Sequence, residues 1–340
     1  MSFLRIIPVV VVLFFAAACG NNNSEKGKEQ KSDSLPDTLA MLSKKIAESS
    51  ENAALYEQRA LYYLNHGDIE KALNDAGKAT ILDPKNSSYL RTLSDVFFAG
   101  GKITKCQEML EKACEINPSD DEALLKLAEL HFYKEEYKIA FEYTEKALKI
   151  DKLNAKADFI RGMMYKDMGD TAKAVRCFQI AVEKDQDYYH AYMQLGIIYS
   201  TKNNPLAADY FNNALNLNPK SIEALYALAM FYQNTGEYNK AIEKYSTILQ
   251  INPKYKFAHY NLGYIHLVYL QVYNQAIKHF TDAISCDPNY AEAYYNRGYC
   301  YELLGNIQAA RIDYQQSLKI KVNYQKAIDG MNRLDKLMNM

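Results

Sequence analysis

The chain has 340 residues, of which 49% are apolar and 24% are charged, a composition that is ordinary for a folded soluble protein. Forty basic and 41 acidic residues leave a formal net charge of −1. This balance excludes the strong basic footprint of a nucleic-acid-binding protein, so we expect no nucleic-acid partner.

The first 18 residues have the layout of an export signal. Arg5 supplies a positive charge, residues 6–15 form a short apolar run, and three alanines precede Cys19. The apolar run is too short to cross a bilayer, which takes about 20 residues. Small residues that end on a cysteine resemble the signal peptide of a bacterial lipoprotein, and this resemblance implies that Cys19 is lipidated and becomes the mature N-terminus. The alternatives are an ordinary cleaved signal with a chance cysteine and an uncleaved anchor.

Residues 19–35 are predicted to form a lipidated cysteine followed by a flexible tether. The stretch after Cys19 is polar, rich in Gly, Asn, Ser and Lys, and has no apolar periodicity. Gly20 rather than Asp follows the cysteine. By resemblance to the simplest lipoprotein sorting rule, Gly20 favours anchoring in the outer membrane of a bacterial cell envelope, with the folded part facing the periplasm.

Residues 36–52 carry one apolar helical face, which includes Leu39, Leu42 and Ile46, and are predicted to form an N-terminal capping helix. A spacing of about 34 residues then recurs over residues 53–324. Proline after a helix end stops that helix and directs the chain into the next one. The positions that mark the segment ends are Pro84, Pro118, Lys152, Gln186, Pro219, Pro253, Pro288 and Val322.

Each of the eight segments is predicted to form two helices joined by a turn. A small residue recurs in the first helix, at Ala60, Ser94, Ala128, Gly162, Gly196, Ala229, Gly263 and Gly298. A second small slot opens the second helix, at Ala72, Cys106, Ala140, Ala174, Ala207, Ala241, Ala276 and Ala310. The turn glycines, which suit positive φ, are Gly67, Gly101, Gly169, Gly236 and Gly305.

A 34-residue helix–turn–helix period with these slots resembles the tetratricopeptide repeat (TPR) family. The resemblance implies an all-α fold: a right-handed α-solenoid superhelix of about eight units over residues 53–324. Residues 325–340 carry a further apolar stripe and are predicted to form a C-terminal capping helix. The fifth segment is one residue short near residues 202–205, and the seventh has one extra residue near 267–273. We expect both changes to fall in the turn between helices.

No catalytic constellation is recognisable in the sequence. The six histidines are scattered, and there is no HExxH, Walker loop, GxSxG or GxGxxG motif. We therefore expect no enzyme activity, no metal, no cofactor and no small-molecule substrate; an enzyme in its own right is the third-ranked interpretation. Cys106 and Cys114 lie two helical turns apart, roughly 12 Å, which is too far for a disulfide. The cysteines after Cys19 are interpreted as small buried hydrophobes, with a Cys286–Cys300 disulfide left open.

Candidate binding residues lie in the later segments, where 16 of the 29 tyrosines fall between residues 222 and 324. The TPR resemblance implies a concave groove that is lined by the first helix of each unit and holds a protein or peptide ligand. Asparagines in this lining resemble the ladder with which some long TPR superhelices hold a peptide main chain. The candidate groove residues are Tyr226, Met230, Tyr260, Asn261, Tyr264, Tyr295, Asn296 and Tyr299. The alternative is that tyrosine is simply the favoured aromatic and that the groove is solvated.

These features predict a membrane-anchored TPR scaffold or adaptor lipoprotein that binds partner proteins or peptides in bacterial envelope assembly or secretion. The alternative function is a regulatory or substrate-presenting subunit of a cell-envelope enzyme that acts on peptidoglycan. In either case the partners are a protein and, through the N-terminal lipid, a membrane.

Overall fold

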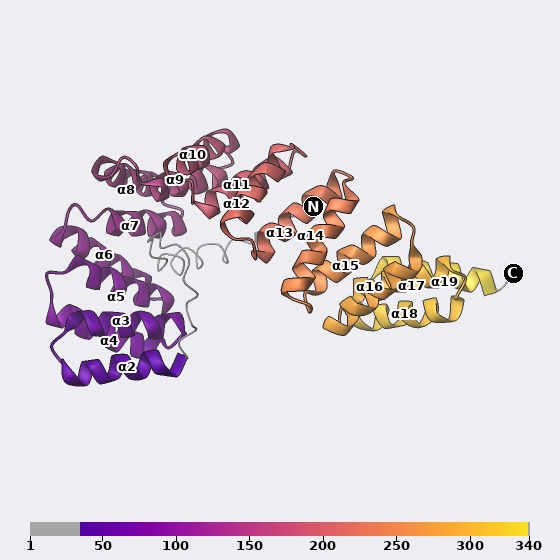
Figure 1. Cartoon of the computed structure of the whole chain (residues 1–340), viewed down its shortest axis with the longest axis horizontal. Coiled ribbons are helices and arrows are strands. Elements are labelled where there is room, and N and C mark those ends of the chain that lie inside the picture. The colour runs from indigo at the N-terminus through magenta and orange to yellow at the C-terminus, as the bar shows by residue number, and fades with distance from the viewer. Residues whose placement is uncertain (1–34, 339–340) are drawn as a thin grey trace. The chain divides into compact units, whose positions relative to one another are not determined.

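A computed structural model describes residues 35–338, and every regular element in this range is a helix (Figure 1). The chain divides into an N-terminal lobe that ends at Asp185 and a C-terminal lobe that begins at Gln186. Cys19 and the predicted signal and tether lie outside the described residues. None of the described helices is long and apolar enough to cross a membrane.

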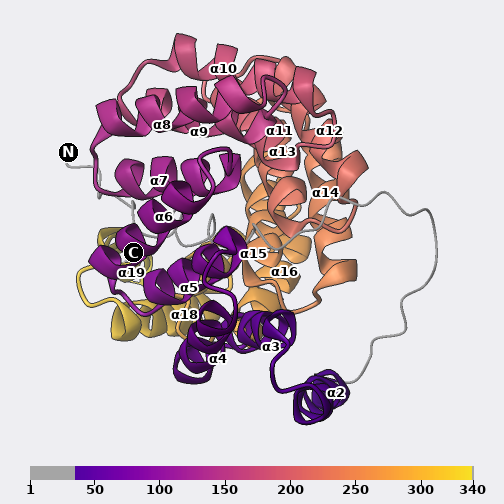
Figure 2. The same cartoon turned by 90° about the vertical axis from the view of Figure 1, so that its left-hand side faces the viewer.

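Within residues 35–185, the N-terminal lobe has one single helix followed by four antiparallel helix pairs. Each pair packs against the next along the chain, as two perpendicular views show (Figures 1 and 2). The helices are α2 (Leu35–Glu48), α3 (Ala53–Asn65), α4 (Ile69–Leu82), α5 (Ser87–Ala99), α6 (Ile103–Ile116), α7 (Asp121–Tyr133), α8 (Tyr137–Ile150), α9 (Ala155–Asp167) and α10 (Thr171–Lys184).

The C-terminal lobe contains four more helix pairs and ends on a single helix that packs against the last pair. Its helices are α11 (Tyr189–Ser200), α12 (Leu206–Leu217), α13 (Ile222–Asn234), α14 (Tyr238–Ile251), α15 (Lys256–Tyr264), the π-helix η1 (Ile265–Tyr269), α16 (Tyr273–Cys286), α17 (Ala291–Leu303), α18 (Ile307–Ile320) and α19 (Gln325–Met338). The all-α repeat fold predicted from the sequence is confirmed within each lobe.

Many helices begin at a residue whose side chain caps the first turn. Asp68 accepts a hydrogen bond from the backbone N–H of Lys71, and Asp170 accepts one from that of Lys173. Such caps satisfy N–H groups that the helix itself leaves without a partner, and each stabilises a helix by about 1 kcal/mol. Helix starts therefore recur at the same 34-residue spacing as the apolar positions.

The small slots mark the places where the two helices of a pair touch. All eight residues that open the second helix are fully buried. Where the first helix carries glycine, an aromatic ring of the second helix fills the space. A Cβ built on Gly162 would lie 2.5 Å from the ring of Phe178, and one on Gly263 would lie 2.8 Å from the ring of Phe280. Close packing of this kind requires glycine at those positions.

The turns between paired helices use the left-handed backbone conformation. The five turn glycines have φ between 70° and 82°. In the repeats that lack glycine there, Glu135, Asn203 and Gln271 adopt φ values of 60°, 50° and 56°. A non-glycine residue in this region costs about 1–2 kcal/mol, so helix packing imposes the turn even where the sequence does not favour it.

The extra residue of the seventh repeat, predicted near residues 267–273, is not accommodated in the connecting turn alone. It lies in η1, a π-helical continuation of α15, and not only in the connecting turn. Ile265 and Leu267 on this segment are both buried. A wider helical turn takes up one more residue while it keeps both of these side chains in the core, which a longer loop would not do.

Candidate protein-interaction surface

The candidate binding residues lie on the first helices of three successive repeats in the C-terminal lobe: α13, α15 and α17. Five of them are tyrosines with half-buried side chains. We call these five the tyrosine row: Tyr226, Tyr260, Tyr264, Tyr295 and Tyr299. Met230, also half-buried, lies on α13 beside the start of the row.

The same aromatic contacts surround the row in each of the three repeats. In each repeat, the first tyrosine of the row packs against a ring from the second helix of the same repeat. The ring centroids are 5.9 Å apart for Tyr226 and Tyr245, 5.7 Å for Tyr260 and Phe280, and 5.7 Å for Tyr295 and Tyr314. The same tyrosine also packs against a tyrosine that directly precedes α15, α17 or α19. The centroid distances are 5.9 Å from Tyr226 to Tyr255, 4.9 Å from Tyr260 to Tyr290 and 5.5 Å from Tyr295 to Tyr324. These contacts hold the rings in fixed positions, since aromatic pairs favour offset and edge geometries.

The two asparagines connect one repeat to the next through the row. The Nδ2 of Asn261 donates to the hydroxyl of Tyr226 at 3.0 Å, and the Nδ2 of Asn296 donates to that of Tyr260 at 2.9 Å. Both asparagines are buried, with exposed fractions of 8% and 7%. The amides expected to present a ladder to a ligand are thus already engaged in orienting tyrosine hydroxyls. Their predicted direct contact with a ligand stays a prediction.

Burial affects the ionisation of Tyr260 in the row. It raises the pKa of Tyr260 to about 12, although the bond from Asn296 acts in the opposite direction. The Tyr260 hydroxyl therefore stays protonated at neutral pH, and it can donate one hydrogen bond while it accepts the one from Asn296. Tyr260 thus offers a neutral, oriented hydroxyl group beside an apolar ring face.

An arginine that the sequence analysis did not single out closes the row. Arg333 of α19 lies over the ring of Tyr299 at 5.6 Å and pairs with Glu302, with 2.7 Å between Nε and Oε1. The helix next to α17 at this place is α19, and it contributes a guanidinium group to the end of the row. The residue was missed because it lies in the predicted C-terminal capping helix, outside residues 53–324, although it follows Tyr299 by one 34-residue spacing.

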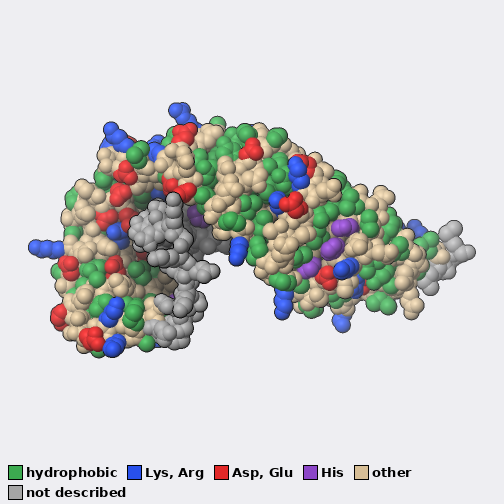
Figure 3. Space-filling model, viewed as in Figure 1, with side chains coloured by type: hydrophobic (Ala, Val, Ile, Leu, Met, Phe, Trp, Pro, Cys, Tyr) green, Lys and Arg blue, Asp and Glu red, His purple; other side chains and the backbone are tan. Residues whose placement is uncertain are grey.

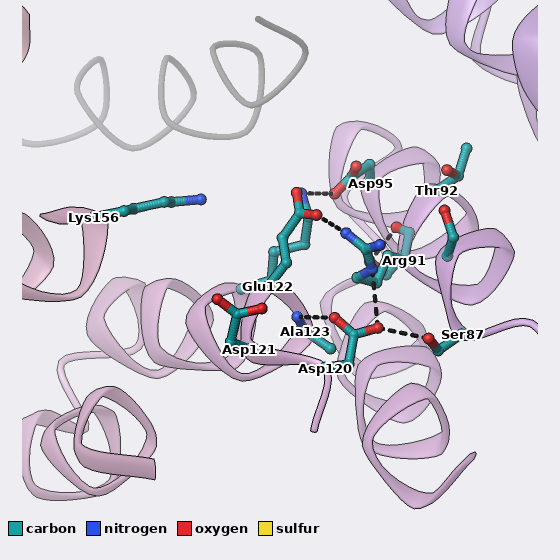
Figure 4. A network of polar contacts seen from close by, with 12 residues as sticks. Ser87, Arg91, Thr92, Asp95, Asp120, Asp121, Glu122, Ala123 and Lys156 are labelled. Carbon is teal, nitrogen blue, oxygen red and sulfur yellow. Dashed lines mark hydrogen bonds and ion pairs between the residues drawn. The ribbon is translucent and has the colours of Figure 1, made fainter. Parts of the chain in front are cut away.

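The polar residues of the N-terminal lobe form a network among themselves (Figure 4). Lys126 pairs with Asp95 at 2.8 Å, and both are buried. Arg91 pairs with Asp120 at 3.2 Å and also with Glu122. Burial raises the pKa of the Asp95 carboxyl, and Lys126 opposes this shift. These side chains are therefore partnered with one another across successive repeats.

The five cysteines within the described residues are free. Cys106, Cys177 and Cys300 are buried, and burial raises the pKa of the Cys106 and Cys300 thiols to about 12. A thiol that stays protonated is a poor nucleophile. The interpretation as small buried hydrophobes is confirmed for Cys106, Cys177 and Cys300, whereas Cys114 and Cys286 are only half-buried, and the Cys286–Cys300 disulfide is not formed.

One cluster was missed from the sequence altogether. His259, His279 and Asp282 converge between α15 and α16 in the C-terminal lobe. Twenty positions separate the two histidines, so no short motif contains them. Only the antiparallel packing of the helix pair brings them together, and the His-x-x-Asp spacing on α16 was the one local signal.

Comparisons with known proteins agree with the repeat fold. Models described as tetratricopeptide repeat or TPR repeat match residues 161–222, 210–243, 230–268 and 279–312. The chain is 22% identical over 199 residues to anaphase-promoting complex subunit 3 of Schizosaccharomyces pombe, covering 58% of this chain and 30% of the relative. It is 23% identical over 196 residues to BBSome complex member BBS4 of Bos taurus, covering 57% of this chain and 37% of the relative. The chain thus spans only about a third of the length of these relatives.

A solved structure of the C-terminal part of a TPR repeat-containing protein from Cytophaga hutchinsonii is similar in fold. It superposes with a TM-score of 0.61 at 18% identity and covers 70% of this chain and 97% of the other. Repeats of this kind imply a scaffold for protein–protein interactions. From the repeat spacing, the buried small slots and the matched models together, residues 161–268 and 279–312 carry tetratricopeptide repeats, and the fold is that of a TPR protein.

Proposed function

We propose that this protein is a membrane-anchored adaptor lipoprotein of a bacterial cell envelope, which binds an extended segment of a partner protein along the tyrosine row. The observation that carries the proposal is the threefold repetition of one aromatic arrangement on α13, α15 and α17. A packing role alone requires buried rings, whereas the five tyrosines of the row keep part of each side chain open to solvent.

The row suits an extended peptide for physical reasons. Tyrosine offers a large contact face with few rotatable bonds and a polar end, and it is enriched among the residues that dominate binding energy. Asn261 and Asn296 hold two of the hydroxyls in place before any ligand arrives. A surface that is already ordered loses less conformational entropy on binding, which raises affinity.

The anchoring part of the proposal is supported by the sequence of residues 1–35. The alanines before Cys19 favour lipidation, and Gly20 favours the outer membrane over retention at the inner one. A lipid on Cys19 and the polar stretch after it would place the repeats at the periplasmic face of the membrane. The proposed role of the protein is in envelope assembly or secretion.

The test is to replace Tyr260, Tyr295 and Tyr299 together with alanine in the full chain. The matched control replaces three tyrosines of the N-terminal lobe: Tyr62, Tyr133 and Tyr137. Proteins crosslinked to each variant in intact cells are captured and identified, and circular dichroism checks helicity. We expect the row variant to lose at least about tenfold of the captured partner, since interface tyrosines contribute 1 kcal/mol or more each, whereas the control keeps it.

Unchanged capture by the row variant, with helicity retained, would refute binding at the row. If the partner captured by the wild type is a peptidoglycan hydrolase or synthase, the protein serves as a subunit of that enzyme instead of as an assembly adaptor.

A further inference from the structure

Histidine side chains gather on one surface of the C-terminal lobe, over α15 and α16 (Figure 3). His259 comes from α15, His266 from η1, and His279 and Asp282 from α16. One nitrogen of His259, one nitrogen of His279 and one carboxylate oxygen of Asp282 all lie within 4.8 Å of one another. His279 and Asp282 are three positions apart, so they share one face of α16.

Hydrogen bonding fixes which nitrogen of His259 carries a lone pair. The Nε2 of His259 is 2.9 Å from the carbonyl oxygen of Pro253, which can only accept, so Nε2 carries the proton. Nδ1 is then the atom with the lone pair. It is buried, has no hydrogen-bond partner within residues 35–338, and lies 3.8 Å from Oδ2 of Asp282. A buried acceptor that is left without a donor is costly and calls for an explanation.

His279 shows the same feature. Its Nδ1 is also buried without a hydrogen-bond partner among the described residues. Histidine coordinates metal ions through a ring nitrogen that carries a free lone pair.

We propose that His259, His279 and Asp282 form a binding site for a divalent transition-metal ion of the Zn²⁺ class. Two imidazole nitrogens and one carboxylate oxygen are a ligand set that suits zinc, and three protein ligands leave one coordination position for water or a fourth side chain. The unpartnered nitrogens of His259 and His279 are explained by this role.

The geometry requires only a small adjustment. Zn–N bonds of about 2.0–2.1 Å place two tetrahedral ligands about 3.4 Å apart. The carboxylate and His259 are already 3.8 Å apart, and the widest pair has to close by little more than about 1 Å. Side-chain rotation of partly exposed residues covers that distance without movement of the helices.

His266 is placed to complete or support the site. Its ring centroid lies 5.2 Å from that of His279, and its Nδ1 donates to the carbonyl oxygen of Leu262 at 2.8 Å. This bond leaves the lone pair on Nε2. A bound ion would then join α15, η1 and α16, so that the π-helical segment of the seventh repeat is fixed by metal coordination.

The test uses the purified full chain in detergent after chelation and dialysis. Zn²⁺ is titrated in by calorimetry, and Co²⁺ is added separately, because its absorption bands report the ligand set. We expect one ion per chain. His279→Gln and Asp282→Asn, examined as separate variants, should each weaken binding at least about tenfold, which is the effect seen even when only the groups behind a ligand are removed.

His66→Gln is the matched control, since His66 is an exposed histidine of the N-terminal lobe. It should bind Zn²⁺ as the wild type does, and Zn²⁺ should raise the thermal midpoint of the wild type and of this control but not that of His279→Gln. The proposal is overturned if the wild type binds no ion in the micromolar range, or if His279→Gln and Asp282→Asn, with helicity retained, bind as tightly as the wild type.

Discussion

Replacement of Gly162 by alanine tests the packing that defines the repeat. An added Cβ would lie 2.5, 2.7 and 3.0 Å from three carbons of the Phe178 ring, which is fully buried. Such overpacking costs about 1–3 kcal/mol. Alanine gains up to about 1 kcal/mol over glycine from helix propensity. We therefore expect Gly162→Ala to destabilise the fold by about 1–2 kcal/mol net.

The matched control is Gly77→Ala. Gly77 lies within α4, and a Cβ there would meet nothing within 4 Å, so only the propensity gain remains. This variant should be more stable by about 0.5–1 kcal/mol. The double variant Gly162→Ala/Phe178→Leu should lose less stability than the two single variants together, because the smaller side chain makes room for the new methyl group. This difference, the coupling free energy of the two substitutions, should reach about 0.5–3 kcal/mol.

Urea unfolding followed by circular dichroism at equal protein concentration measures these differences as shifts in midpoint. If Gly162→Ala is stabilised as much as Gly77→Ala, or if the double variant shows no coupling, close contact between the paired helices does not determine the small slot.

Two further predictions concern the ends of the chain. Arg297→Met should lower the free energy of unfolding by about 3–5 kcal/mol, because it leaves the buried Asp313 without the arginine that now pairs with it at 2.8 Å. Lys44→Met removes an exposed ion pair whose atoms are 4.0 Å apart, and it should cost less than about 0.5 kcal/mol in the same urea assay. Cys19→Ser should abolish lipidation and with it the sensitivity of processing to globomycin; identical processing of the wild type with and without globomycin would contradict a lipoprotein.

The repeat could be predicted from the sequence because its determinants are local and recur. Each small slot, each helix-ending proline and each turn glycine has its own physical cause, and the small slots recur in all eight segments while the prolines and the turn glycines recur in five each. The turns at Glu135, Asn203 and Gln271 follow from the same packing although their residues do not favour positive φ. The fold is thus determined by many weak signals that coincide.

The contacts of the site could be predicted only in part. Tyr260 and Asn296 were singled out as candidate ligand-binding residues, yet their bond to each other depends on how two repeats stack, which no single repeat encodes. The sequence does not show whether Asp95 and Lys126 face solvent or pair with each other. The cluster of His259, His279 and Asp282 depends on the register between two antiparallel helices, and an insertion changes that register in this repeat.

Site-specific photocrosslinking in intact cells is the most direct test of binding at the tyrosine row. A photoreactive phenylalanine derivative is placed at Tyr264 or Tyr299 in the row, and at Tyr133 in the N-terminal lobe as the control. Binding at the row predicts that positions 264 and 299 crosslink to the same partner protein and that position 133 does not. A partner captured equally well from position 133, or from position 133 alone, would contradict it.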